Sequence, residues 1–529
     1  MTQTLARTLE DAIAHHRAGR LPEAEKLYRA ALSAEPAHAG ANHNLALITF
    51  QRGQGEASLG HFKRALSSDP SQPLYWLSYG RALLSVGRLP EAVTLLRQAR
   101  LHGVSGPGLE ALERQAGISS GTPQDPANLF ATALRAHEAG RLSEAASLYQ
   151  KVIALKPDQA EPYGNLANVL CMIGNAAEAE AVVRKGMAAL PGNAQLAFNL
   201  GYVMTAEERF DEAVAAYRQA IALAPDMADA HYHLGSLLSE HGNVAEGFQH
   251  LMRRAELVYG TGKAPPKSQP DPAHKIKHDR EQRDYLAGGK APPDAPEVDD
   301  MFHLGNGARI EGSTINQANA TPELLATWRQ AWPQMVVIEN FLVPEALERL
   351  RDYCARSTIW RRIYAAGYIG ATPADGFACP LLAQIAEDIV ATWPEIFAPH
   401  HFSYLGAFKY DSELSTGTNI HADFSAVNVN FYIAPDEANL DPESGGMKIW
   451  DVSVDNEPDM RRFNSDEAAV LAYLKSKNAK PIIVPHRANR AVIFKSSLIH
   501  KTDDCRFAEG YRNKRINVSL LYGKYGAPT

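Results

Sequence analysis

Cysteine and long hydrophobic runs are scarce in this chain of 529 residues. Only four cysteines occur, Cys171, Cys354, Cys379 and Cys505, and they are too few and too scattered for a disulfide scaffold or a zinc ribbon. No window approaches the roughly 18 consecutive apolar residues of a membrane-spanning helix, and the N-terminal segment lacks the apolar core of a secretory signal. We therefore expect a cytoplasmic protein without a membrane span.

The chain also lacks a strong excess of charge and several familiar catalytic motifs. Its 53 basic and 60 acidic residues give a net charge of −7, which argues against a general nucleic-acid or membrane-surface binder. There is no GxxxxGKS or GxxxxGKT phosphate loop, no GxSxG elbow, no HExxH motif and no CxxC pair. The composition is that of a globular protein, and the length predicts two to four domains of roughly 150 residues.

The N-terminal half contains a repeated pattern. Prolines that close predicted helices fall at Pro36, Pro70, Pro157, Pro191 and Pro225, and three of the four gaps between them are 34 residues. Glycines placed to turn the chain between paired helices keep the same phase: Gly19, Gly53, Gly87, Gly140, Gly174 and Gly242. A period of 34 residues predicts a helix-turn-helix unit.

These residues resemble the tetratricopeptide repeat (TPR), with about seven units over residues 5–258 that are interrupted near 105–126. The resemblance implies an α-solenoid of helix pairs over residues 1–258, whose concave groove suits peptides and protein segments. An array that serves only as a scaffold or a dimerisation surface is the alternative, because a fold does not fix a function.

Residues 259–320 change character, because proline, lysine and aspartate replace the apolar periodicity. This composition predicts a linker. The stretch HKIKHDREQRDYL could form a short helix, and its balanced charges favour a solvated face over a binding patch. We accordingly expect a fragment that begins near Thr321 to keep the whole C-terminal domain, residues 321–529.

Short strands dominate that C-terminal domain. Two early helices, PEALERLRDYCARS and PLLAQIAEDIVATW, precede FSYLGAFKY, VNVNFYI, GMKIW, KPIIV, RAVIF and RINVSLLYG, which Gly, Pro, Asp and Asn turns separate. Many short strands over roughly 200 residues favour a jelly-roll or barrel. The helical interval at 452–480 could serve as a lid.

His421 and Asp423 lie two residues apart in TNIHADFSAVNVNFYI, so both side chains project from one face of an extended segment. His500 follows the predicted strand RAVIF. Two histidines and one carboxylate on one side of a metal leave the other positions open, as in the facial triad of non-haem Fe(II) oxygenases. Cys505 lies in the charged loop KTDDCRF, and we expect it to be an incidental residue and not a nucleophile.

A fourth element lies on the last strand. Alternation puts Arg515, Asn517 and Ser519 on one face of RINVSLLYG. An arginine on such a polar face suits a barrel interior that holds a carboxylate, because the planar guanidinium can bind a carboxylate bidentately. Arg512 and Lys514 are alternative anchors.

Residues 330–526 therefore resemble the Fe(II)/2-oxoglutarate-dependent dioxygenases, including their entry segment in VVIENFLVPEALERLRDYC. The resemblance implies a double-stranded β-helix (jelly-roll), Fe(II) bound by His421, Asp423 and His500, and 2-oxoglutarate and O₂ as cosubstrates. It also implies that Arg515 anchors 2-oxoglutarate. Tyr410 occupies the position where related hydroxylases use a tyrosine on the cosubstrate, and Asn430, with Asn428 as its rival, is expected to line the pocket.

The combined expectation is a multidomain hydroxylase that acts on a protein or peptide held by the TPR groove. The retained carboxylate of Asp423 favours hydroxylation, because halogenating relatives lose it. An oxygenase acting on a sugar or small metabolite, with the repeats recruiting partners, is one alternative. A non-catalytic TPR scaffold is another. The sequence leaves the substrate and the oligomeric state open.

Overall fold

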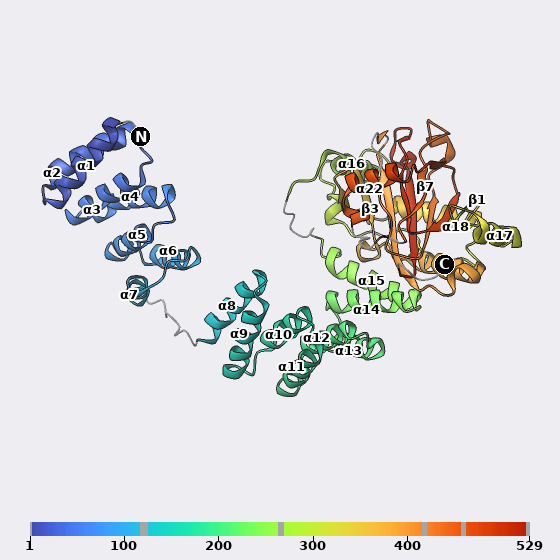
Figure 1. The fold of residues 1–529 in the computed structure, drawn as a ribbon, viewed down its shortest axis with the longest axis horizontal. Coiled ribbons are helices and arrows are strands. Elements are labelled where there is room, and N and C mark those ends of the chain that lie inside the picture. Colours follow the sequence, from blue (N-terminus) through green and yellow to red (C-terminus); the bar gives the residue numbers. More distant parts are fainter. Residues whose placement is uncertain are drawn as a thin grey trace. The chain divides into compact units, whose positions relative to one another are not determined.

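The computed structural model describes residues 3–116, 125–262, 269–411, 413–414, 420–455, 457 and 462–524. The chain divides into two compact units, Met1–Thr132 and Ala133–Thr529, and each is described by itself. Helices make up the first unit and the start of the second, and strands are concentrated in the C-terminal part (Figure 1). No helix among the described residues is both long and apolar enough to cross a membrane.

The first unit is built from helices that pack in pairs. Small and aromatic side chains fill their crossings, where Ala24 and Tyr28 are fully buried. A helix at 107–115 lies inside the predicted interruption and buries Leu109 and Leu112 in the same core as the preceding helices. The helices are α1 (Gln3–Arg17), α2 (Leu21–Ala34), α3 (Ala39–Gln51), α4 (Gly55–Ser68), α5 (Pro73–Ser85), α6 (Leu89–Leu101) and α7 (Pro107–Gln115).

The second unit continues the helix pairs. Gly201 of α12 shows why the helices approach closely: a Cβ there would lie 2.6 Å from the ring of Tyr217 on α13. Only glycine leaves room for that buried ring. The helices are α8 (Pro126–Glu138), which contains the division between the units, α9 (Leu142–Leu155), α10 (Ala160–Met172), α11 (Ala176–Ala189), α12 (Ala194–Ala206), α13 (Phe210–Leu223), α14 (Ala228–Glu240) and α15 (Val244–Tyr259).

The last repeat helix is part of the core of the C-terminal domain. Val244, Phe248 and Leu251 of α15 belong to the same hydrophobic cluster as the strands, and the Phe248 ring lies edge-on to Phe402 at 5.6 Å between centroids. Arg254 donates a hydrogen bond of 2.6 Å to the Ala374 carbonyl. The last repeat helix and the sheet therefore share one hydrophobic core within the second unit.

Residues 269–320 pack closely, which differs from the linker and the solvated helix expected over 259–320. Helix α16 (Ala273–Leu286) buries Lys275, His278 and Gln282, and the Gln282 amide donates to the Ser357 carbonyl at 2.8 Å. Asp279 and Asp299 neutralise the Lys275 ammonium. These acidic and basic side chains form ion pairs with each other and are not solvated. A balanced charge in the sequence therefore did not distinguish a buried helix from an exposed one. Two short 3-10 helices follow, η1 (Val298–Asp300) and η2 (Gln317–Asn319).

The C-terminal domain is rich in sheet. Strands of a seven-stranded antiparallel sheet follow the order β1-β9-β6-β12-β4-β3-β2, a second sheet has the order β10-β7-β8, and β11 pairs with β5. The strands are β1 (Met335–Ile338), β2 (Arg362–Tyr364), β3 (Tyr368–Ala371), β4 (Phe402–Tyr410), β5 (Glu413–Leu414), β6 (Val427–Tyr432), β7 (Met447–Ser453), β8 (Pro481–Val484), β9 (Ala491–Lys495), β10 (Leu498–Thr502), β11 (Cys505–Arg506) and β12 (Ile516–Tyr522).

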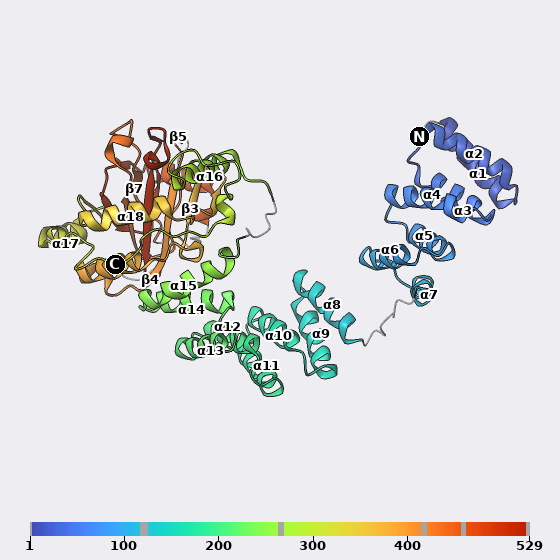
Figure 2. The same ribbon diagram turned by 180° about the vertical axis from the view of Figure 1, so that it is seen from behind.

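Helices cover one face of the seven-stranded sheet, as α18 shows in Figure 2. The two early helices predicted from sequence are α18 (Pro344–Arg356) and α19 (Pro380–Thr392). Within the interval 452–480, α22 packs Val470 and Leu474 against Ile420, whereas residues 456 and 458–461 lie outside the described part. The remaining helices are α17 (Pro322–Gln330), η3 (Pro373–Asp375), α20 (Pro394–Phe397), η4 (Asp436–Ala438), α21 (Arg462–Ser465), α22 (Glu467–Ser476) and η5 (Tyr511–Asn513).

Strand alternation separates the core from a polar pocket. On β6, Val429 and Phe431 face the helix-covered core, whereas Asn428 and Asn430 line a cavity on the other face. Strand β12 repeats the division, because Val518 belongs to the core and its neighbours on either side line the cavity. Because side chains alternate between the two faces of a strand, the same strands supply apolar residues to the core and polar residues to the cavity.

Candidate metal centre

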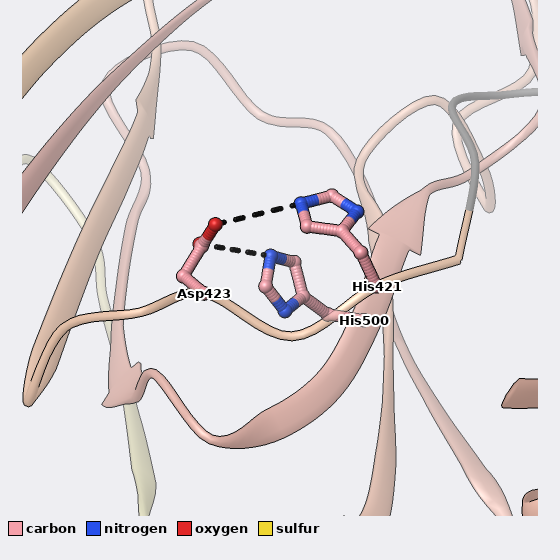
Figure 3. A group of neighbouring side chains, drawn as sticks. All are labelled: His421, Asp423 and His500. Atoms are coloured by element: carbon pink, nitrogen blue, oxygen red, sulfur yellow. Dashed lines mark ion pairs between the residues drawn. The ribbon is translucent and has the colours of Figure 1, made fainter. Parts of the chain in front are cut away.

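The structure brings His421, Asp423 and His500 together, with one potential ligand atom of each within 4.8 Å of the others. The Nε2 atom of His421 lies 3.6 Å from Asp423 Oδ1, and the Nε2 atom of His500 lies 3.4 Å from Asp423 Oδ2. Figure 3 shows the three side chains converging on one point. This is the group expected from the sequence.

Backbone pairing sets the position of both histidines. The His421 N–H donates to the His500 carbonyl at 3.0 Å, and the His500 N–H donates to the His421 carbonyl at 2.8 Å. The imidazole rings consequently lie side by side, with centroids 4.5 Å apart. The Asp423 N–H donates to the Ser496 carbonyl at 3.0 Å and fixes the carboxylate next to them.

The protonation of His500 suits a metal ligand. Its Nδ1 lies 2.9 Å from the Leu498 carbonyl, which can only accept, so Nδ1 carries the proton. With the proton on Nδ1, the lone pair of Nε2 is the one available to a metal, whereas in the metal-free protein an Nε2–H faces Asp423 as a donor. Such a hydrogen bond on the remote nitrogen fixes the tautomer and the ring orientation of many metal-binding histidines.

Asp423 is held in its anionic form. Burial by itself would raise its pKa, but hydrogen bonding to His500, the charges of His500 and His421 and the Asn428 amide together bring the pKa below its usual value. An anionic carboxylate beside two imidazole nitrogens forms a facial set of ligands for a divalent cation such as Fe(II).

A row of hydrogen bonds leads away from this group. The Asn428 amide donates to Asp423, and the Asn430 amide donates to Asn428 at 2.9 Å. Ser519 donates to the Asn430 oxygen, and the Asn517 amide lies 3.4 Å from the same atom. Both candidates of β6, Asn428 and Asn430, therefore line the pocket. Asn428 is the one that contacts a potential ligand.

Arg515 ends this row and has no carboxylate partner among the described residues. It is 1% exposed, and its Nη1 donates to Asn517 at 2.8 Å. The guanidinium also donates to the carbonyls of Gly445 and Gly446 and lies over the Tyr410 ring at 4.5 Å. Because a buried cation without a counter-charge is costly, this position fits an anionic ligand.

One cavity of about 500 Å³ connects these groups. Its polar side holds the His/Asp/His group and the row that ends at Arg515. Aromatic rings also line the cavity, with the rings of Tyr364 and Tyr368 stacked at 4.5 Å and Tyr368 stacked on Tyr410 at 5.0 Å. The Tyr410 hydroxyl lies 3.0 Å from Thr502 Oγ1. Tyr410 lines the cavity beside Arg515, and the contact with a cosubstrate that the resemblance implies for it stays a prediction.

The alternative anchors lie elsewhere. Lys514 forms ion pairs with Asp411 and Glu281, and Arg512 is solvent-exposed. Neither lines the 500 Å³ cavity. Arg515 differs from them because it follows the alternation of β12 into the cavity. Cys505 is buried beside Phe507 and Tyr410 and is not part of the ligand group.

Sequence reasoning missed several cavity residues. Tyr432 lies two residues after Asn430 on β6, so the same alternation could have found it. Tyr364 and Tyr368 flank the turn between β2 and β3, which lies far from the motif in the sequence. Only strand pairing brings that hairpin to the cavity, because β3 pairs with β4.

Family models match the helical part of the chain. A "TPR repeat" model matches residues 193–242, and "Tetratricopeptide repeat" models match residues 136–199, 9–73 and 44–108. Residues 9–108 and 136–242 carry tetratricopeptide repeats. No curated protein matches the chain.

Solved structures of repeat proteins are similar to part of the chain. MamA from Desulfovibrio magneticus RS-1 is 18% identical, over 42% of this chain and 97% of that one, with a TM-score of 0.22. A tetratricopeptide repeat protein from Parabacteroides merdae is 15% identical over 49% and 95%, with a TM-score of 0.25. An O-GlcNAc transferase mutant from Thermobaculum terrenum is 22% identical over 28% and 29%, also at 0.25.

Proposed function

We propose that the sheet-rich domain is an Fe(II)- and 2-oxoglutarate-dependent dioxygenase that hydroxylates its substrate. One observation carries the proposal: an open-sided group of two imidazoles and a carboxylate shares a cavity with a buried arginine that pairs with no acid among the described residues. The first feature suits a metal that must also bind ligands from outside, and the second suits the remote carboxylate of a 2-oxo acid.

The strand arrangement supports a double-stranded β-helix for this domain. Along the chain, β4, β6, β9 and β12 belong to the large sheet, whereas β7, β8 and β10 belong to the small one. The backbone of His421 pairs with that of His500, which extends the small sheet at its β10 edge. Such alternation between two facing sheets is typical of jelly-rolls.

The donor set fits Fe(II), which His421, Asp423 and His500 would hold. With 2-oxoglutarate and O₂, the iron would supply the oxidising power to hydroxylate a C–H bond, with release of succinate and CO₂. Arg515 would pair with the carboxylate of 2-oxoglutarate that lies away from the metal. The Tyr410 ring, stacked on Tyr368 and beside Arg515, would keep the guanidinium in place and exclude water from this end of the cavity.

The proposed substrate is a protein or peptide that the TPR groove captures. The continuity of α15 with the core of the sheet-rich domain supports this, because a polypeptide on the second group of repeats is held on the same compact unit as the cavity. Tethering raises the local concentration of a substrate segment. A TPR scaffold without turnover remains compatible with the repeats.

The test is succinate formation by the purified full-length protein with Fe(II), 2-oxoglutarate and O₂. His421→Ala and Asp423→Ala should lose bound iron and succinate formation together, and His102→Ala, an exposed histidine of the first unit, should lose neither. Retention of iron and full succinate formation by His421→Ala would refute the proposal. Proteins retained by His500→Ala and then hydroxylated by the wild type, as seen by mass spectrometry, would identify the substrate.

A further inference from the structure

A second cavity lies across the seven-stranded sheet from the metal centre, with a volume of about 320 Å³. Strand β4 separates the two cavities: Phe408 and Tyr410 line the metal pocket, whereas Lys409 between them lines the second cavity. Alternation along the strand sends Lys409 to the helix-covered face. Apolar side chains form much of the wall, namely those of Ala355, Ile433, Ala434, Pro435 and Ile516.

Lys409 is a buried amine without a carboxylate partner in the described part of the chain. It is 2% exposed, its Nζ lies 3.2 Å from His278 Nε2, and it lies over the Tyr511 ring at 3.5 Å from the centroid. The His278 Nδ1 lies 3.0 Å from Asp279 Oδ1, so Nδ1–H donates to that carboxylate and Nε2 accepts from Lys409. An ammonium group at this position has two weak partners, the His278 imidazole and the Tyr511 ring, and no anionic partner. Burying a charge without a counter-charge is costly in free energy.

The other cations of this cavity differ in their pairing. Lys514 is neutralised by Asp411 and Glu281, and Arg351 is neutralised by Glu348. Arg512 is solvent-exposed and forms no ion pair with any described residue. No acidic residue in that part of the chain lines the cavity. Lys409 and Arg512 are therefore the basic side chains of this cavity that pair with no carboxylate among the described residues.

We propose that this cavity binds a small organic carboxylate, whose anionic head pairs with Lys409 and whose apolar body covers Ile433, Pro435 and Ile516. Arg512 adds favourable charge from the solvent-exposed side. The volume lies at the lower end of the range of small-molecule sites, which suits a short-chain acid. An inorganic anion would leave the apolar wall uncovered, and a neutral molecule would leave Lys409 without a counter-charge. The site is independent of the metal centre and of its proposed reaction.

Ligand binding at this site should be linked to protonation. Burial lowers the pKa of Lys409, and a bound carboxylate favours the ammonium form, so binding takes up a proton and tightens as the pH falls. The titratable and charged groups around Lys409 are His278, Asp279 and Glu281 on α16, Cys354 on α18, Tyr511 on η5 and Lys514 before β12.

The test is calorimetric titration of the full-length protein with hexanoate at pH 6 and pH 8. We expect saturable binding that is tighter at pH 6. Lys409→Met should weaken it at least about tenfold, since it removes a charge-assisted hydrogen bond, and Arg512→Ala should weaken it about threefold. Arg487→Ala removes another solvent-exposed arginine, one that does not line the cavity, and should bind as the wild type does.

Three comparisons make the result decisive. If circular dichroism shows that Lys409→Met is unfolded, Arg512→Glu at the exposed position supplies the charge test and should weaken binding more than Arg512→Ala. Equal binding of 1-hexanol or of inorganic phosphate would overturn the proposal, as would no binding of hexanoate. Loss of binding in Arg515→Lys but not in Arg512→Glu would locate the hexanoate in the metal pocket and would also overturn it.

Discussion

Replacing Asn428 with alanine tests how much the metal centre depends on the amide that holds Asp423. The Asn428 amide donates to the carboxylate, and its own oxygen accepts from Asn430. A hydrogen bond to a charged group contributes about 1.5–3 kcal/mol. Because about 1.4 kcal/mol corresponds to a factor of ten, the affinity for Fe(II) should fall about 10- to 100-fold. The same range is typical when outer partners of metal ligands are removed.

The assay is anaerobic competition between the protein and a chromophoric chelator for Fe(II), with folding checked by circular dichroism. Asn439→Ala is the matched control, because Asn439 is also a buried asparagine whose side chain is hydrogen-bonded, to the Ser444 carbonyl and the Asp441 N–H, but it lies outside the metal cavity. Its metal affinity should equal that of the wild type. A folded Asn428→Ala variant with wild-type affinity would refute the reasoning that Asp423 binds the metal in the orientation described.

Three further predictions follow from other contacts. Arg515→Lys keeps the charge but loses the bidentate fork, so it should raise the KM for 2-oxoglutarate about tenfold or more, whereas Arg512→Ala should leave it unchanged. Burial and nearby arginines lower the pKa of His486 to about 3. The unfolded chain therefore binds more protons below pH 6.5, and the protein should lose about 2 kcal/mol of stability between pH 7 and pH 5, a loss that His486→Phe removes. Phe248→Ala should destabilise the second unit by about 3–5 kcal/mol, and Phe62→Ala should instead destabilise the first.

Each of these has a contradicting outcome. A large KM effect of Arg512→Ala with none from Arg515→Lys would move the anchor to Arg512. Equal acid sensitivity of the metal-free wild type and His486→Phe, in denaturant unfolding at the two pH values, would show that this imidazole is not the sensitive group. Limited proteolysis assigns unfolding to a unit, and an unchanged second unit in Phe248→Ala would show that α15 is not part of its core.

The sequence predicted local features well. The 34-residue period located the repeats, because each helix pair has the same internal packing and leaves a signal within a short window. The spacing of His421 and Asp423, and the alternation of Arg515, Asn517 and Ser519, correctly indicated which side chains share a face. These inferences need only the local geometry of an extended segment, which neighbouring residues determine.

The tertiary structure decided what depends on distant pairing and on burial. Residues 269–320 look like part of a linker because their charges are balanced and their apolar periodicity is weak, yet α16 buries Lys275 and Gln282 against partners far along the chain. A fragment beginning near Thr321 would remove these contacts together with those of Phe248, so it is no longer expected to keep an intact domain.

The same distinction applies within the site. Sequence identified Arg515 as a candidate anchor and left Arg512 and Lys514 open, because all three are basic residues near the start of one strand. Pairing of β12 with β4 and β6 set the register that directs Arg515 into the cavity. The acids on α16 and at the end of β4 pair with Lys514. The local sequence pattern determined which basic side chains lie near the start of β12. The long-range strand register and burial decided that Arg515 is the one that lies in the cavity without an acidic partner among the described residues.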